Sequence, residues 1–161
     1  MTTKEYNQTV ELYSDNVFRF VLKNIRNEEK AKDIVQDSFE KMWQKRDSVD
    51  GSKAKSYLFT TAYRTMIDKI RKHKKQGNWE EVNERDYAQS AVHHGLSEVL
   101  QEALSRLPEK QRSVVMLRDY EGYNYEEIGE ITDLSLSQVK VYIFRARKAL
   151  KDYLVSIEHV I

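Results

Sequence analysis

The residues in this sequence best suited to chemistry are a run of basic side chains near its C-terminal end. The segment from Leu136 to Lys151 holds five basic residues and no acidic one. These five are Lys140, Arg145, Arg147, Lys148 and Lys151. Lysine and arginine neutralise the phosphates of nucleic acid, and arginine can also donate two hydrogen bonds to the edge of guanine. The segment is therefore the first candidate for binding nucleic acid.

Helical spacing separates an apolar face of this segment from a basic one. The apolar residues that recur at helical spacing, and should face inward, are Val139, Ile143, Ala146 and Leu150. The opposite face then holds Ser137, Val141, Phe144 and Lys148. A helix with a basic and polar outer face suits entry into the major groove of DNA. The alternative is a solvated basic helix that packs only within the protein.

Two helix starts lie close together just before and within this region. Asn124 and Glu127 have the spacing of a capping pair, and Ser135 and Gln138 repeat that pattern. The distance between them leaves room for about two turns of helix and a short bend, which is the spacing of a helix-turn-helix. The stretch from Tyr125 to Leu150 is therefore predicted to be a helix-turn-helix whose second helix reads DNA.

Composition favours a helical protein and excludes several classes of function. The 161 residues include one proline, five glycines and no cysteine, which argues for few turns and against disulfides, cysteine-ligated zinc and iron–sulfur clusters. The acidic residues and the four histidines are scattered or poorly spaced for a shared metal, and there is no glycine-rich phosphate loop. We therefore predict no catalytic residue, no metal, no cofactor and no small-molecule substrate.

The hydropathy of the chain predicts a cytoplasmic location. No apolar run approaches the roughly 18 residues of a membrane span, so membrane insertion is not expected. The first residues also lack the apolar core of a signal peptide.

Charge alternates along the chain although the net charge is only +1. Residues 53 to 75 hold eight basic residues and one acidic residue, and the run from 136 to 151 is the second basic block. Residues 76 to 98 and 109 to 133 are each acidic on balance. Two basic blocks separated by acidic ones indicate two separate surfaces that face DNA.

Apolar periodicity places further helices upstream of the helix-turn-helix. They are expected at about 5–26, 29–45, 57–75 and 96–107, with another helix that starts at Pro108 and ends at Gly122. Residues 46–56 form a polar loop. The predicted fold class is all-α, with two small helical domains joined by a flexible linker. The predicted boundaries are 1–76 for the first domain, 77–95 for the acidic linker and 96–161 for the second domain.

Three stretches of this sequence resemble motifs of one known family. The string LPEKQRSVVMLRDYEGYNYEEIGEITDLSLSQVKVYIFRARKAL, from Leu107 to Leu150, resembles the C-terminal promoter-binding domain of bacterial sigma factors of the extracytoplasmic-function (ECF) group. The segment from Asp33 to Phe39 is similar to the family's D-L-V-Q-E-T-F motif. Tyr57, Leu58 and Phe59, followed by Ala62 and Asp68, are similar to its W-L-Y…A…D helix. The resemblance covers nearly the whole chain, in the family's order.

The resemblance implies a transcription initiation factor of the sigma-70 family. Such a protein binds core RNA polymerase, directs it to promoter DNA and helps to melt the duplex. Residues 1–76 would correspond to sigma region 2 and residues 96–161 to sigma region 4. An anti-sigma factor as a further partner is usual in this family.

The resemblance also assigns roles to residues on three surfaces. Polymerase binding would fall to Asp33, Gln36, Asp37 and Glu40. The minus-ten element would be bound by Lys53, Lys55, Tyr57, Arg64, Arg71 and Lys72. Tyr57 and Tyr63 are the candidate stacking rings, and the alternative for either ring is a place in the core. The minus-thirty-five element would be bound by Ser137, Gln138, Lys140, Val141, Phe144, Arg145 and Arg147.

Four departures from the family pattern affect these expectations. Asp133 stands in the turn where the family usually has glycine, and aspartate tolerates the left-handed conformation. Gly129 replaces a small residue, usually alanine, and keeps close packing there. Arg64, and the segment from Ser135 to Gln138, differ from the family pattern, so the bases read there do not transfer.

The residues alone leave an alternative function open. A two-domain helix-turn-helix regulator that does not associate with polymerase would show the same C-terminal pattern. Its N-terminal domain would need residues that line a ligand pocket or a dimer interface. The N-terminal half instead shows a polar stripe and a second basic block, which favours the sigma factor.

Overall fold

The computed structural model describes residues 1–76 and 96–158, which form two compact helical units. Those described ranges contain helices and no strand. The predicted fold class, all-α with two helical domains and a C-terminal helix-turn-helix, is therefore confirmed. The predicted acidic linker at 77–95 lies outside the described residues.

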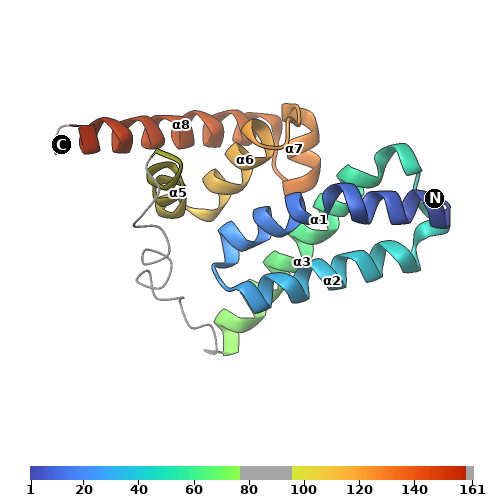
Figure 1. The fold of residues 1–161 in the computed structure, drawn as a ribbon. Helices are drawn as coiled ribbons and strands as arrows, with labels where there is room; N and C mark the ends of the chain where they lie inside the picture. The colour runs from blue at the N-terminus through green and yellow to red at the C-terminus, as the bar shows by residue number, and fades with distance from the viewer. Residues whose placement is uncertain (77–95, 159–161) are drawn as a thin grey trace. The chain divides into compact units, whose positions relative to one another are not determined.

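The N-terminal unit consists of three long helices that pack against one another (Figure 1). They are α1 (Thr3–Ile25), α2 (Glu28–Gln44) and α3 (Ala54–Gln76). Fully buried side chains from all three helices form its core: Val17, Phe20, Ile34, Met42, Leu58, Phe59 and Met66. Burial of these large apolar side chains is the main favourable term that holds the three helices together.

The junction between α1 and α2 takes only two residues. Arg26 ends α1 in the left-handed conformation at φ 56°, and its backbone N–H donates to the carbonyl of Leu22. Asn27 then caps α2, because its side chain accepts the N–H of Lys30 at 3.0 Å. The break expected between the helices at 5–26 and 29–45 lies at Arg26 and Asn27, and Glu28 already belongs to α2.

The segment between α2 and α3 is more ordered than the polar loop predicted for residues 46–56. It forms two short 3₁₀ turns, η1 (Arg46–Ser48) and η2 (Gly51–Lys53). The Asp50 carboxylate accepts the N–H of Ser52 at 3.0 Å and its hydroxyl at 2.8 Å. The backbone hydrogen bond, followed by the hydroxyl one, lowers the pKa of Asp50. Because the turn directly precedes α3, that helix starts at Ala54 rather than at Tyr57.

The C-terminal unit consists of four helices, three short and one long. They are α5 (Leu96–Arg106), α6 (Glu109–Asp119), α7 (Tyr125–Thr132) and α8 (Leu136–Glu158). Both α5 and α6 pack against α8 (Figure 1). The buried core includes Leu104, Val114, Leu117, Ile128, Val139, Ile143 and Ala146. α6 begins at Glu109, one residue later than predicted. Pro108 is its N-cap residue, and the Pro108 carbonyl accepts the N–H of Arg112 at 2.9 Å.

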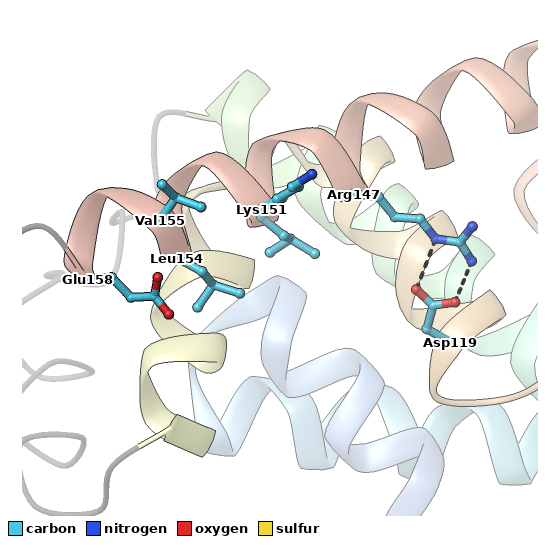
Figure 2. Close-up of a pocket in the computed structure, with 7 residues that line it drawn as sticks. Asp119, Arg147, Lys151, Leu154, Val155 and Glu158 are labelled. Atoms are coloured by element: carbon cyan, nitrogen blue, oxygen red, sulfur yellow. Dashed lines mark hydrogen bonds and ion pairs between the residues drawn. The ribbon is translucent and has the colours of Figure 1, made fainter.

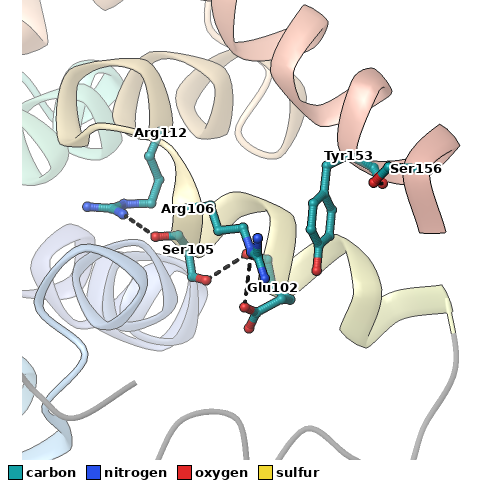
Figure 3. A network of polar contacts seen from close by, with 6 residues as sticks. All are labelled: Glu102, Ser105, Arg106, Arg112, Tyr153 and Ser156. Atoms are coloured by element: carbon teal, nitrogen blue, oxygen red, sulfur yellow. Dashed lines mark hydrogen bonds and ion pairs between the residues drawn. The ribbon is translucent and has the colours of Figure 1, made fainter. Parts of the chain in front are cut away.

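Two arginines fix α5 within this unit (Figure 3). The buried Arg112 guanidinium donates to the carbonyls of Ser105 at 3.3 Å and Leu107 at 3.0 Å, which closes the corner between α5 and α6. The Arg106 guanidinium lies 4.5 Å from the centre of the Tyr153 ring on α8 and pairs with Glu102 at 3.3 Å. A cation over an aromatic ring is favourable, so this contact helps to hold the last turns of α8 on α5.

Candidate nucleic-acid interface

Reciprocal hydrogen bonds fix the starts of α7 and α8. The Asn124 side chain accepts the N–H of Glu127 at 2.8 Å, and the Glu127 carboxylate accepts the N–H of Asn124 at 3.0 Å. Ser135 and Gln138 make the same pair of bonds, at 3.2 and 2.9 Å. Both predicted capping pairs are confirmed, and together they set where the second helix of the helix-turn-helix begins.

The turn between α7 and α8 is tight because of two unusual residues. Asp133 adopts the left-handed conformation at φ 58° and ψ 42°. The N–H of Leu134 then donates to the carbonyl of Gly129 at 3.0 Å. A Cβ atom on Gly129 would lie 2.8 Å from the Leu134 carbonyl oxygen. The predictions that Asp133 accepts this conformation and that Gly129 permits close packing are both confirmed.

Replacing Gly129 by alanine should destabilise the C-terminal unit by about 1 kcal/mol. Alanine is the better helix former by about 1 kcal/mol, but its Cβ meets a backbone oxygen that can move only if the turn moves. Overpacking of this kind typically costs about 1–3 kcal/mol. Urea denaturation followed by circular dichroism measures the change in the free energy of unfolding.

Gly51→Ala is the matched control for that substitution. The three atoms nearest to a Cβ at Gly51 would all belong to the Glu5 carboxylate, which is the movable end of a side chain. Its cost should therefore be smaller than that of Gly129→Ala. Equal costs at the two positions would show that the turn is not as tightly packed as described.

The two faces of α8 divide as the helical spacing predicts. Val139, Ile143 and Ala146 are buried, and Leu150 is half-buried. On the opposite face the side chains of Val141 and Phe144 are 44% and 69% exposed. An exposed phenyl ring contributes little to the packing of the core, so the Phe144 ring is available for contact with a partner.

A groove runs beside the outer face of α8. It is lined by Tyr125, Lys140, Ile143, Phe144, Arg147, Lys148 and Lys151. Lys140, Lys148 and Lys151 are exposed, as are Arg145, Ser137 and Gln138 on the rest of this surface. Cationic side chains around aromatic rings provide what a nucleic-acid backbone needs from a protein surface.

Arg147 is a predicted DNA contact whose charged group is bound within the protein. Its guanidinium meets both carboxylate oxygens of Asp119, with Nη2 at 2.6 Å and Nε at 3.3 Å (Figure 2). The hydrogen bond to Asp119 raises the pKa of Arg147, which stays charged. No local pattern indicates this pair, because the two residues lie 28 positions apart on different helices.

On α2 the four residues of the predicted polymerase-binding stripe do not have the same surroundings. Asp33, Gln36 and Glu40 are exposed. Asp37 is half-buried and binds Lys69 of α3 at 2.8 Å. The pair joins the polar stripe of α2 to the basic helix α3, close to a hydrogen bond from Lys41 to the Thr65 hydroxyl at 2.9 Å.

The second basic block is spread over more than one face of α3. Tyr57, Arg64 and Arg71 recur every seven residues and so share one face, with Lys72 beside them. Lys55 instead points its ammonium at the rings of Tyr13 and Phe59, at 5.6 and 5.8 Å from their centres. Lys53 is exposed in η2, just before the helix.

Tyr63, the second candidate ring, belongs to the core. Its side chain is 6% exposed and its ring centre lies 6.5 Å from that of Phe20. Tyr57 therefore remains the aromatic candidate on this helix.

Two features are absent from the described ranges: a cluster of metal-binding side chains and a helix that could cross a membrane. Within 1–76 and 96–158, no three metal-binding side chains are grouped so that they could hold an ion. None of the helices there combines the length and apolarity that a bilayer crossing requires.

Two family models match the chain, one for each unit. The model of sigma-70 region 2 matches residues 9–76, and that of sigma-70 region 4 matches residues 97–150. The first range holds the polar stripe and the second basic block. The second range holds the helix-turn-helix.

Known proteins of the same kind align with this chain over most of their length. ECF RNA polymerase sigma factor SigM of Bacillus subtilis is 32% identical over 146 residues, which cover 88% of this chain and 90% of SigM. ECF sigma factor SigW of the same organism is 30% identical, over 90% of this chain and 86% of SigW.

The fold of this chain also resembles that of a sigma factor of known structure. The sigma factor RpoE from Bartonella quintana, crystallised with the anti-sigma factor NepR, aligns with a TM-score of 0.79 and 26% identity, over 94% of this chain and 98% of that chain. The solved structure, the two region models and the Bacillus relatives are all sigma factors or parts of them. The chain belongs to the ECF sigma factors of RNA polymerase.

Proposed function

We propose that this protein is a transcription initiation factor that binds core RNA polymerase and directs it to a specific set of promoters. The observation that carries the proposal is the N-terminal unit, which matches sigma-70 region 2 over residues 9–76 and exposes a polar stripe on α2, beside a C-terminal unit that matches region 4. Residues 1–76 would bind polymerase and the minus-ten element, 77–95 would link the units, and 96–161 would bind the minus-thirty-five element. The protein would act in the cytoplasm, where polymerase and chromosome meet, and would carry no catalytic centre of its own.

Polymerase binding is assigned to the stripe on α2. Asp33, Gln36 and Glu40 are exposed polar side chains on a helix whose other face is buried. Asp37 is also assigned to this stripe. Its carboxylate is held in place by the ion pair with Lys69.

Minus-ten binding is assigned to the face of α3 that carries Tyr57, Arg64 and Arg71, with Lys53 and Lys72 beside it. Positive charge follows the phosphates of a strand, and an aromatic ring stacks on a base that has left the duplex. Lys55 contributes charge from its place over the Tyr13 and Phe59 rings.

Minus-thirty-five binding is assigned to the outer face of α8. Lys140 and Arg145 are the candidates for hydrogen bonds to base edges. Ser137 and Gln138, in the first turn, are placed for polar contacts. Val141 and Phe144 are suited to the methyl group of thymine.

An anti-sigma factor is the proposed regulator of the protein. RpoE, which aligns with nearly the whole chain, was solved in complex with an anti-sigma factor. Such a partner would cover surfaces that the polymerase needs.

Reconstitution with core RNA polymerase tests the proposed function. The purified chain should co-elute with the core enzyme and support transcription from promoters selected by the holoenzyme. A variant with Asp33, Gln36 and Glu40 replaced by alanine should lose polymerase binding and transcription, because it lacks the proposed contact surface. The variant should still fold, because these side chains are exposed and contribute nothing to the core. Failure of the unaltered chain to bind core polymerase would favour the helix-turn-helix regulator instead.

Replacing thymine by uracil in the selected minus-thirty-five element should weaken binding about three- to fourfold per contacted base, because a buried methyl group contributes about 0.8 kcal/mol. The exchange removes the methyl group and leaves every hydrogen-bonding atom in place. Phe144→Ala should bind both duplexes equally, since it has lost the ring that covers the methyl group. Holoenzyme binding to paired thymine and uracil duplexes measures the difference.

If Phe144→Ala distinguishes the two duplexes as well as the unaltered chain does, the ring does not read the methyl group.

A further inference from the structure

The Asp119–Arg147 pair joins the end of α6 to the basic helix α8. Figure 2 shows the guanidinium lying against the carboxylate with two contacts, which the distances of 2.6 and 3.3 Å describe as bidentate. The two side chains are 43% and 49% exposed, so solvent and ions reach the pair. Exposed ion pairs are weak, and a competing anion can therefore displace the carboxylate.

Arg147 also lines the groove on the outer side of α8. Its neighbours along that groove include three cations, Lys140, Lys148 and Lys151. A carboxylate and a phosphate present similar pairs of oxygens to a guanidinium. Asp119 therefore holds Arg147 in the way that a phosphate of DNA would hold it, and the surrounding lysines provide the positive field that draws such a phosphate in.

We propose that Asp119 is a specificity-determining residue that withholds Arg147 from DNA until a promoter is bound. The inference rests on the proposed DNA binding by α8 and adds a residue outside that helix. On random DNA, Arg147 stays on Asp119. On a promoter, base contacts hold α8 in one register, a phosphate comes to rest in the groove, and Arg147 moves to it.

The free-energy consequence is a lower affinity for DNA that is not a promoter. Each phosphate that a cationic side chain neutralises releases counterions from the duplex, and this release drives non-specific binding. An arginine held by a carboxylate does not contribute to that release. The loss falls on random DNA, so the ratio of promoter to random binding rises.

A purely structural role for the pair makes a different prediction. If Asp119 only tied α6 to α8, its removal would lower stability and leave the salt dependence of DNA binding unchanged. The slope of log affinity against log salt concentration therefore separates the two roles, because it counts the phosphates that are neutralised.

The test uses the full chain with four substitutions and a random-sequence duplex. Asp119→Asn removes the carboxylate charge, whereas Asp119→Glu is a separate variant that keeps it. Asp152→Asn is the charge control, because Asp152 is an exposed acid on α8, the helix that carries Arg147. Arg147→Gln, alone and combined with Asp119→Asn, shows whether an effect passes through Arg147. Affinity is measured by fluorescence anisotropy over a series of salt concentrations, after circular dichroism has shown that each variant is folded.

Asp119→Asn should raise affinity for the random duplex about three- to tenfold at roughly 0.1 M salt and steepen the slope by about 0.9, the value of one more phosphate. Asp119→Glu should keep both at the original values, and Asp152→Asn should leave the slope unchanged. On a promoter selected with the unaltered holoenzyme, Asp119→Asn should change the slope little, because Arg147 already contacts phosphate there.

Two results would overturn the inference. One is an unchanged slope on random DNA in Asp119→Asn. The other is a gain that persists in full when Arg147→Gln is also present, since Arg147 would then not carry it. A chain that binds no duplex DNA, alone or with core polymerase, would instead refute the proposed DNA binding itself.

Discussion

Replacing Ile143 by alanine should destabilise the C-terminal unit by about 2–5 kcal/mol. Ile143 is 2% exposed on the inner face of α8. Removing three carbon atoms from a packed core loses their burial and leaves a cavity that the surrounding helices fill only in part. A helical unit of this size has little stability to spare, so the loss should leave a measurable fraction unfolded. Urea denaturation with circular dichroism, and hydrogen exchange of α7 and α8, measure the effect.

Phe144→Ala is the matched control, because Phe144 is the next residue along the same helix and is 69% exposed. It should leave the unfolding transition within about 0.5 kcal/mol of the original, as surface substitutions do. It should nevertheless weaken promoter binding. A large stability loss in Phe144→Ala, or none in Ile143→Ala, would mean that the two faces of α8 are wrongly assigned.

Replacing Lys140 or Arg145 by alanine should weaken promoter binding by about 1–3 kcal/mol each, if the side chain contacts a base edge. Both positions are exposed on α8, where Lys140 directly precedes Val141 and Arg145 directly follows Phe144. The loss should fall on particular base pairs, because an arginine that donates two bonds to guanine discriminates against the other bases. Transcription by the reconstituted holoenzyme on a library of minus-thirty-five variants measures this profile.

Two further variants sharpen that measurement. Arg145→Lys keeps the charge but loses the planar fork, so it should bind DNA well and still lose base preference. Lys148→Ala should weaken binding evenly over all sequences, as loss of a phosphate contact does. If neither Lys140→Ala nor Arg145→Ala alters the promoter profile, these side chains do not read bases.

Features that depend on a few neighbouring residues were predictable from the sequence. The capping pairs of Asn124 with Glu127 and of Ser135 with Gln138 are local, as is the left-handed turn at Asp133. The burial of Val139 and Ile143 followed from helical spacing alone. The two-unit, all-α fold follows from the same local signals, repeated along the chain.

Features that depend on packing between helices were not predictable. Nothing near Arg147 in the sequence indicates that Asp119 binds it, and nothing near Asp37 indicates Lys69. A core position for Tyr63 was the favoured expectation, but its neighbour Phe20 lies on another helix and was not predictable. Helical spacing gives the direction in which a side chain points, but the identity of its neighbour comes only from the folded chain.

The start of α3 differs from the predicted one because an ordered turn precedes the helix. The Asp50 side chain orders the residues just before α3, so this helix begins three residues earlier than apolar periodicity indicates. The change matters for the site, because it places Lys53 and Lys55 next to and within a helix rather than in an open loop.

The division of α8 into a buried face and an exposed face has an evolutionary consequence. Side chains such as Val141 and Phe144 take no part in the core, so exchanging them leaves the folded state intact. If the outer face of α8 reads promoter DNA as proposed, single substitutions on it can change promoter preference while each variant still folds.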